Sequence, residues 1–194
     1  MRWTVLWPLL ACALLVAASP DNRILTVRVH LKGEVDDGPQ AGYYYVAFST
    51  LPGLLTGPAP SGENWTHYAL YTRGRFYFAT RRSLDVPPSL FRTTLPPEPY
   101  TRGTVSHDRR TLSVDVPLQV LWALRGREDP IKVNVVTTDR WYRPLDALGR
   151  GPGDPYGFVS FDPQRDVVVR VEAREGNAPP AYDVVAVDVT VRVP

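Results

Sequence analysis

Apolar and polar residues alternate along most of this chain, and this alternation limits the folds open to it. In residues 23–33 every second residue from Leu25 to Leu31 is apolar, and residues 183–193 carry valine at every second position from Val185 onward. A period of two places such side chains on one face of an extended strand. The pattern therefore predicts β-strands that bury one face and leave the other in solvent.

Further segments extend this pattern to about nine strands. Residues 42–50 are aromatic and β-branched, which predicts a strand covered on both faces, and residues 65–73 and 75–80 flank Gly74 as a tight hairpin would. Residues 118–124 have apolar side chains at helical spacing and predict a helix of about two turns. The other predicted strands are 111–117, 131–139, 157–162 and 166–174.

These elements predict an all-β fold, an antiparallel β-sandwich with one short helix. The 194 residues suit one domain with its own core, so we expect residues 19–194 to form a single sandwich domain. Proline supplies 20 residues, about twice its average share, and it belongs in connections because it disrupts helices and central strands. We therefore expect surface loops at residues 84–103 and 142–156.

The N-terminal residues predict a signal peptide that forms a helix before the sandwich. An apolar run from Trp3 to Ala18 follows a single Arg and ends in small residues. The run is short for a membrane span, which needs about 20 apolar residues. Val16 and Ala18 stand where a signal peptidase requires small side chains. We expect cleavage of residues 1–18 and a location outside the cytoplasm, whether secreted, periplasmic or at the cell surface.

Cys12 is the only cysteine, and it leaves alternatives open for the N-terminus. The residues from Leu9 to Cys12 resemble a bacterial lipobox, in which the cysteine is lipidated after cleavage. A membrane-anchored envelope lipoprotein is therefore one alternative, and an uncleaved apolar anchor helix is another. Cleavage after Ala18 would instead remove the cysteine and leave a mature chain without disulfide bonds.

The charge argues against nucleic acid as a partner. The chain has 22 basic and 20 acidic residues, a formal net charge of +2, and the basic residues form no continuous stripe. A nucleic-acid-binding protein concentrates its positive charge. We expect no nucleic-acid partner, and contact with a membrane only through the N-terminal segment.

No motif indicates an enzyme or a cofactor. The three histidines, His30, His67 and His107, are not at metal-ligand spacing, and the sequence has no G-x-S-x-G elbow. The Gly-rich residues 149–157 lack the Lys-Ser/Thr of a phosphate-binding loop. The sequence thus predicts a protein that is not an enzyme and has no cofactor. A hydrolase assembled from distant residues is an alternative that composition leaves open.

Asp36 and Asp37 form an acidic pair in the segment GEVDDGP and are candidates for calcium, which prefers oxygen ligands. Aspartate before glycine is also ordinary turn chemistry. Both interpretations stay open from the sequence.

Residues 62–80 are rich in aromatic side chains and suggest a stacking platform for a ligand. If residues 65–73 form one strand, Trp65, His67 and Tyr71 share a face. Packing across the strands of a sheet is the alternative role for these side chains. The candidate platform residues are Trp65, His67, Tyr71, Trp141, Tyr142 and Tyr156.

Several of these segments, taken together, resemble a group of exported bacterial proteins with no assigned activity, many of them predicted lipoproteins. The resemblance lies in GYYYVAFST, TGPAP, NWTHYALY, GRFYF and TLSVDVPLQVL followed by IKVNVVTTD, and it covers most of residues 23–193. It implies export and a β-rich domain.

A second resemblance is to DOMON-like and family-9 carbohydrate-binding sandwiches. In these a strand leads through P-L-x-x-L into a strand that ends near Thr-x-Asp, as residues 116–121 and 135–139 do here. Such domains bind haem or sugars. The haem version uses methionine and histidine ligands, and the only methionine here is Met1. The sugar version implies exposed Trp or Tyr beside polar groups, for which Trp65, Trp141, Tyr142 and Tyr156 are candidates.

The sequence therefore predicts an exported β-sandwich of unknown activity that binds a ligand or associates with a surface. A polysaccharide or an envelope protein is the expected partner. The alternatives are a carbohydrate-binding module, a membrane-anchored envelope lipoprotein and a hydrolase.

Overall fold

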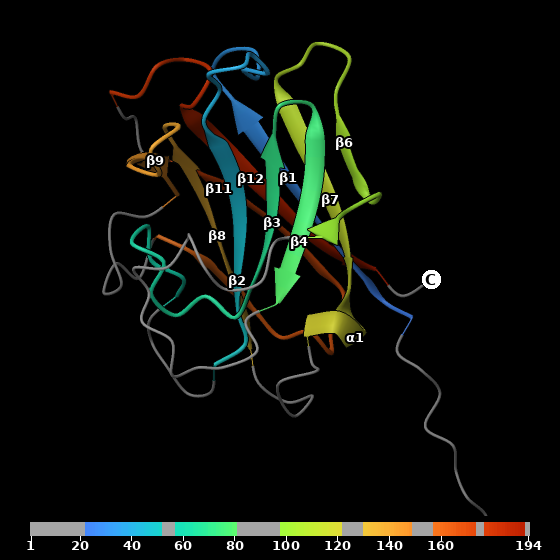
Figure 1. Ribbon diagram of the computed structural model, residues 1–194. Coiled ribbons are helices and arrows are strands. Elements are labelled where there is room, and N and C mark those ends of the chain that lie inside the picture. Colours follow the sequence, from blue (N-terminus) through green and yellow to red (C-terminus); the bar gives the residue numbers. More distant parts are fainter. Residues whose placement is uncertain are drawn as a thin grey trace, which may run out of the picture.

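The computed structural model describes residues 22–51, 57–80, 98–121, 130–148, 157–173 and 177–192. These residues form two antiparallel sheets that pack face to face, with one short helix at one end (Figure 1). The predicted all-β sandwich is confirmed. The predicted signal segment with Cys12 and the platform candidate Tyr156 lie outside the described residues.

Twelve strands lie in the described part of the chain. They are β1 (Ile24–Leu31), β2 (Tyr43–Ser49), β3 (His67–Thr72), β4 (Arg75–Thr80), β5 (Glu98–Pro99), β6 (Gly103–Val105), β7 (Thr111–Pro117), β8 (Ile131–Thr138), β9 (Pro144–Ala147), β10 (Val159–Phe161), β11 (Val167–Glu172) and β12 (Val184–Arg192), and the helix α1 is Leu118–Leu121. One sheet has the strand order β11-β12-β1-β7-β6. The other, of seven strands, has the order β10-β8-β2-β3-β4-β5, and β9 also pairs with β8.

The five-stranded sheet presents rows of apolar side chains to its partner sheet. Val169, Val189, Val27 and Val114 stand side by side across four neighbouring strands. The adjacent rows, two residues away in each direction along the strands, are equally apolar and belong to the same buried core. The strict alternation in the sequence thus becomes one continuous apolar surface.

The start of β12 departs from the predicted pattern. Val185 was expected on the buried face, but it is 37% exposed, and Val184 enters the core instead. The reason is a shift of register between His30 and Leu31 of β1, where the chain opposite gains a residue. Such a bulge reverses the inward and outward positions on one side of it.

The seven-stranded sheet is apolar on both faces. Tyr44, Val46 and Phe48 of β2 point into the core between the sheets. The opposite side carries a second group, called here the outer aromatic cluster, which consists of Tyr45, Ala47, Trp65, Leu70 and Val136 with the partly buried Tyr43, Tyr68, Tyr77 and Ala147. The prediction that residues 42–50 are covered on both faces is confirmed.

The hairpin of β3 and β4 turns at Arg73 and Gly74, between the paired residues Thr72 and Arg75. Both turn residues have positive φ, 49° for Arg73 and 75° for Gly74. This is the two-residue turn whose twist matches that of the flanking strands, so the predicted tight hairpin is confirmed. Its register places Tyr77 opposite Leu70 on the outer face.

Two segments predicted to be loops contain short strands. β5 lies in residues 84–103, and β9 lies in residues 142–156. They have two and four residues and include Pro99 and Pro144, so neither shows an alternating pattern. Both pair with a neighbour on one side only, which is where a sheet tolerates proline.

Two glycines test these backbone arguments. A Cβ at residue 42 would lie 1.9 Å from the carbonyl oxygen of Thr138, whereas a Cβ at residue 74 would meet nothing within 4 Å. We expect Gly42→Ala to lower the free energy of unfolding by about 2–3 kcal/mol through this clash. Gly74→Ala should lower it by about 1 kcal/mol, through its positive φ alone. Urea unfolding measures both values, and equal losses would contradict the packing described around Gly42.

Candidate functional site

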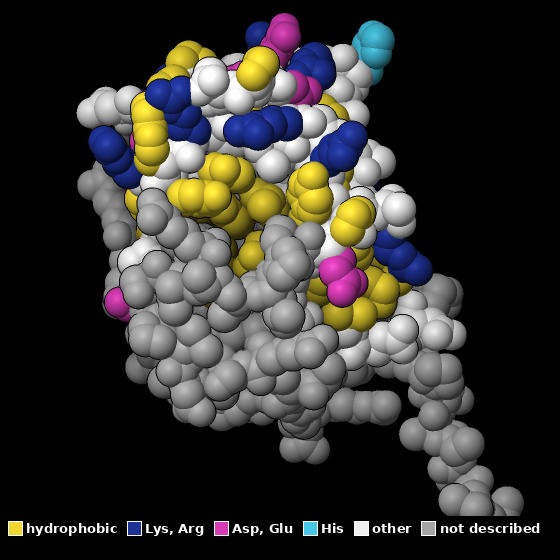
Figure 2. Space-filling view, in the orientation of Figure 1, with side chains coloured by type: hydrophobic (Ala, Val, Ile, Leu, Met, Phe, Trp, Pro, Cys, Tyr) yellow, Lys and Arg dark blue, Asp and Glu magenta, His cyan; other side chains and the backbone are white. Residues whose placement is uncertain are grey.

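The outer face of the seven-stranded sheet gathers aromatic side chains where an antiparallel sheet usually carries polar ones. Figure 2 looks onto this side of the molecule: hydrophobic side chains fill its middle, and Lys and Arg side chains stand along the upper rim. Tyr45 and Trp65 are buried there, and Tyr43, Tyr68 and Tyr77 are partly exposed. The face therefore combines apolar surface with positive charge.

An open hollow of about 370 Å³ lies at the end of this face. Tyr43 from the start of β2, Thr72 from the end of β3, Arg73 from the turn, and Arg75 and Tyr77 from β4 line it. Those lining residues that belong to strands point outward. Successive residues of a strand face opposite ways, and the neighbours Tyr44, Tyr71 and Phe76 pack in the core. The hollow thus offers two phenol rings, a hydroxyl and two guanidinium groups.

The aromatic surface continues from the hollow to the loop between β8 and β9. Tyr142 stacks on Tyr43 with ring centroids 4.6 Å apart and planes inclined by 9°, and their hydroxyls are 3.2 Å apart. Trp141 beside it is 55% exposed. Arg140 lies over the Trp141 ring, 3.8 Å from its centroid, and Arg143 lies 5.5 Å from it. Each such contact stabilises the guanidinium against the ring by about 0.5–1 kcal/mol.

Asp139 holds this loop in place. Its Oδ1 accepts the backbone N–H groups of Trp141 and Arg143 at 2.8 and 2.9 Å, and the N–H of Tyr142 donates to its carbonyl at 3.1 Å. The loop is therefore ordered by its own hydrogen bonds. We call the whole surface the rim surface; it consists of Tyr43, Thr72, Arg73, Arg75, Tyr77, Arg140, Trp141, Tyr142 and Arg143.

Three phenol groups of this face, those of Tyr43, Tyr45 and Tyr68, have a raised pKa and stay protonated at neutral pH. Burial, with a hydrogen bond to Tyr142, raises the pKa of Tyr43 to about 12. Burial also raises the pKa of Tyr45 and of Tyr68. These tyrosines can donate and accept hydrogen bonds and can stack, but they do not act as bases at neutral pH.

Of the predicted platform residues, Trp65, His67 and Tyr71 are only 5%, 0% and 3% exposed. They cannot form the exposed platform that the aromatic stretch suggested. Trp65 precedes β3 and belongs to the outer aromatic cluster, so it does not share a face with His67 as predicted. Its indole Nε1 donates to the carbonyl of Ala59 at 2.7 Å. The structure does bring Trp141 and Tyr142 together at the surface.

His67 is a core residue whose Nδ1 lies 3.0 Å from the hydroxyl of Thr66. Burial lowers its pKa to about 4, and the carbonyl of Val120 offsets only part of this shift. The imidazole is therefore neutral near pH 7 and closed off from solvent. Because both side chains are buried, a substrate cannot reach this hydroxyl–imidazole pair.

A second hydroxyl–imidazole–carboxylate group lies on the outer face of the five-stranded sheet. Thr111 Oγ1 is 3.3 Å from His30 Nδ1, and His30 Nε2 is 2.7 Å from Asp188 Oδ2. Asp188 also pairs with Arg170 at 3.2 Å. The group crosses neighbouring strands and lines neither of the hollows described for this chain. It therefore gives the hydrolase alternative a hydrogen-bond chain that lies outside both of these hollows.

Asp36 and Asp37 pin their loop to the sandwich. Asp36 Oδ2 accepts from the hydroxyl of Tyr182 at 2.8 Å, and Asp37 Oδ1 accepts from the hydroxyl of Tyr71 at 2.6 Å. Arg109 forms an ion pair with the other oxygen of Asp37. Within the described residues, no group of three or more His, Cys, Asp or Glu side chains is placed to hold a metal ion. Both carboxylates are thus engaged within the fold, and Asp36 also accepts the N–H of Gly38 as the turn interpretation expects, while the calcium interpretation stays a prediction.

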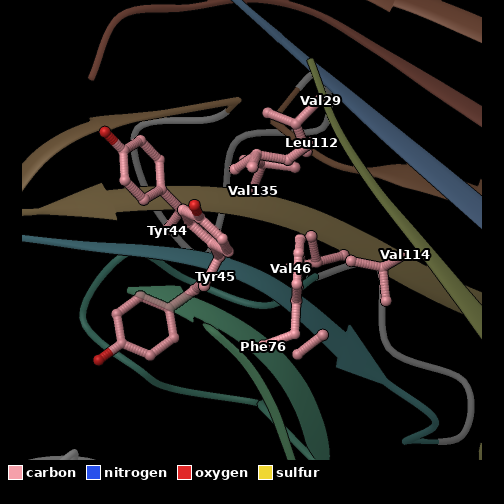
Figure 3. Close-up of a pocket in the computed structure, with 10 residues that line it drawn as sticks. Val29, Tyr44, Tyr45, Val46, Phe76, Leu112, Val114 and Val135 are labelled. Carbon is pink, nitrogen blue, oxygen red and sulfur yellow. The ribbon is translucent and has the colours of Figure 1, made fainter. Parts of the chain in front are cut away.

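The interior of the sandwich offers no ligand site at the cavity shown in Figure 3. Its space of about 10 Å³ lies among apolar side chains of both sheets, Val29, Leu112 and Val135 among them. Such a space holds at most about one water molecule, and an apolar lining gives that water no partners. The candidate site of the described chain is therefore on its surface.

Comparison with known proteins adds no relative to this description. No protein-family model matches the chain, and no curated protein and no solved structure matches it either. The two resemblances noted in the sequence stay predictions. Among the described residues, no helix is long and apolar enough to cross a membrane.

Sequence reasoning missed seven residues of the rim surface: Tyr43, Thr72, Arg73, Arg75, Tyr77, Arg140 and Arg143. The useful signal was the hairpin, because a two-residue turn at Arg73 and Gly74 places Thr72 and Arg75 opposite each other. The contact of Tyr43 with Tyr142 had no local signal. It follows from the pairing of β2 with β8.

The burial of His67 predicts a pH dependence of stability. Above its unfolded pKa of 6.5, His67 is neutral in both the folded and the unfolded chain. As the pH falls from 6.5 towards about 4, the unfolded chain takes up a proton that the folded chain refuses. The free energy of unfolding therefore falls, by about 2 kcal/mol between pH 7 and pH 5 from this residue.

We expect that in His67→Gln and His67→Leu the free energy of unfolding no longer shows the decrease that His67 causes between pH 7 and pH 5. This holds whatever the stability of the variants at pH 7. The matched control is His107→Gln, because His107 is exposed. Chemical denaturation at the two pH values gives the difference for each variant. An unchanged pH dependence in both His67 variants would show that the imidazole is not buried neutral.

Proposed function

We propose that the protein is a non-enzymatic domain that acts outside the cytoplasm and binds a carbohydrate chain along the rim surface. The observation that carries the proposal is the open hollow between Tyr43 and Tyr77, continuous with Trp141 and Tyr142. Export is supported by the apolar N-terminal run that ends in small residues at Ala18.

The chemistry of this surface suits sugar rings. Sugars present apolar C–H faces that pack on aromatic rings and hydroxyl groups that need hydrogen-bond partners. The hollow supplies both kinds of contact, with the rings of Tyr43 and Tyr77 and the hydroxyl of Thr72. This hydroxyl donates to the carbonyl of Gly42 at 3.0 Å and can accept a hydrogen bond from a ligand. Because it is open instead of enclosed, a polymer can pass across it without having to end there.

The backbone of Tyr142 also supports a binding role. Its φ is 68°, in the left-handed region, which strains a residue with a bulky side chain and which Gly or Asn adopts at little cost. Strain of this kind is retained where a side chain serves a function. At this position the strained residue supplies the aromatic ring that stacks on Tyr43.

This proposal separates stability from binding at Tyr142. In Tyr142→Asn, relief of about 1–2 kcal/mol of backbone strain offsets the loss of about 0.5–1.5 kcal/mol of stacking. We expect the free energy of unfolding to change by less than about 1 kcal/mol. The variant should nevertheless lose the retardation that the wild-type protein shows in affinity gels containing polysaccharide.

The gels should contain xylan, mixed-linkage glucan, dextran or polygalacturonate, one in each, and Trp141→Ala should behave like Tyr142→Asn. Val168→Ala is the control, because Val168 is 85% exposed on the other sheet. Wild-type protein that runs freely in every gel would refute carbohydrate binding. Variants that are retarded as strongly as wild type would refute the rim surface as its site.

The predicted export of the protein can be tested separately from its binding. If the N-terminal run is a signal peptide cleaved after Ala18, the intact mass of the protein from its native host corresponds to Ser19–Pro194 in a soluble extracytoplasmic fraction. A membrane-bound species that begins at an acylated Cys12 would contradict this cleavage and make the protein a lipoprotein.

A further inference from the structure

The rim surface carries four arginines, and we infer that its ligand is an acidic polysaccharide whose carboxylate groups bind Arg73 and Arg75 while its rings pack on Tyr43 and Tyr77. The inference rests on the proposed carbohydrate binding and adds the charge of the ligand to it. Arg73 and Arg75 stand far from Arg140 and Arg143 along the chain, so the sequence gives no sign that the four gather on one surface.

Arg73 and Arg75 have their charge free for a ligand. Both are exposed, both line the hollow, and within the described residues neither forms an ion pair. The hairpin turn holds their backbones, since Arg73 is one of its two central residues and Arg75 is paired with Thr72. A planar guanidinium can bind both oxygens of a carboxylate through two parallel hydrogen bonds.

The acidic groups nearby do not cancel this charge. Asp37 reaches the turn, where its Oδ1 lies 3.2 Å from the backbone nitrogen of Gly74, but its other oxygen pairs with Arg109. Asp139, in the neighbouring loop, faces Arg143 at 3.9 Å and is used by backbone N–H groups of the same loop. Among the described residues, the rim surface therefore keeps a net positive charge around its aromatic rings.

The extent of the charge favours a polymer over a small anion. Arg140 and Arg143 stand at Trp141, beyond the stacked pair of Tyr142 and Tyr43, so the positive groups lie at both ends of one aromatic surface. A single small anion would use only one end. A chain with a carboxylate on each sugar would present charge to both ends and rings to the middle.

Single-stranded nucleic acid also combines charge with rings that stack. The acidic polysaccharide is favoured because the protein is proposed to act outside the cytoplasm and because the net charge of the whole chain is only +2. Nucleic acid therefore enters the test as a competing outcome.

The test compares polygalacturonate with the same polymer after methyl esterification, which keeps the backbone and removes the charge. Isothermal titration calorimetry should show about tenfold weaker binding or more for the esterified chain, because each lost charge-assisted hydrogen bond is worth about 1.5–3 kcal/mol. The double variant Arg73→Gln/Arg75→Gln should lose polygalacturonate to the same extent. The control Arg28→Gln/Arg192→Gln removes equal charge from the exposed face of the other sheet and should bind as wild type does.

Each other outcome decides between the two proposals. Equal binding of both polymers would overturn the acidic ligand and leave carbohydrate binding in place. If both double variants lost polygalacturonate affinity equally, net charge alone would explain binding, and the assignment of the site to Arg73 and Arg75 would be overturned. Tighter binding of oligodeoxythymidine than of polygalacturonate would overturn the polysaccharide. A wild-type protein that binds neither polymer, and no neutral polysaccharide in the gels, would refute the proposed function itself.

Discussion

The packing of β2 between two apolar layers is the interaction on which the other features of the structure depend. Tyr44, Val46 and Phe48 meet the apolar rows of the five-stranded sheet, and Tyr45 and Ala47 anchor the outer aromatic cluster. Full burial of one large apolar side chain contributes about 1.5–3 kcal/mol. Because both faces of β2 are covered and both of its edges are paired, this strand is held in the interior of the molecule.

The rim surface depends on β2 through its two neighbours. β3 pairs with one edge of β2 and leads into the hairpin that carries Arg73 and Arg75. β8 pairs with the other edge and leads into the loop that carries Trp141 and Tyr142. Tyr43, the first residue of β2, lies between them and joins the two through its stack on Tyr142. A rigid core thus places two loops from distant parts of the sequence at one end of one face.

Much of the fold was predictable because alternation is a direct record of which side chains share a face. Nine of the twelve described strands and the hairpin followed from it. The other three, β5, β6 and β9, have two to four residues, and β5 and β9 contain proline, so they leave no periodic signal. Alternation does not say which face turns inward when both faces are aromatic. For that reason His67 and Tyr71 were proposed as platform residues, although they pack in the core.

The candidate site was only half visible in the sequence. Trp141 and Tyr142 stood out as aromatic residues in a loop, but the four arginines lie in two separate segments and form no stripe along the chain. Their convergence is a consequence of strand order, which pairs β2 with both β3 and β8. Local patterns carry no information about such pairing, so charge counted along the sequence underestimates charge gathered on a surface.

The central claim is that the rim surface is the place where this protein meets its ligand. The most direct measurement is a nuclear magnetic resonance titration of the isotope-labelled protein with an oligogalacturonate, following backbone amide, arginine Nε–H and tryptophan indole signals. The account predicts shifts confined to residue 43, residues 72–77 and residues 139–143. Shifts centred on the exposed face of β1 and β12, or no shifts at saturating oligosaccharide, would contradict it.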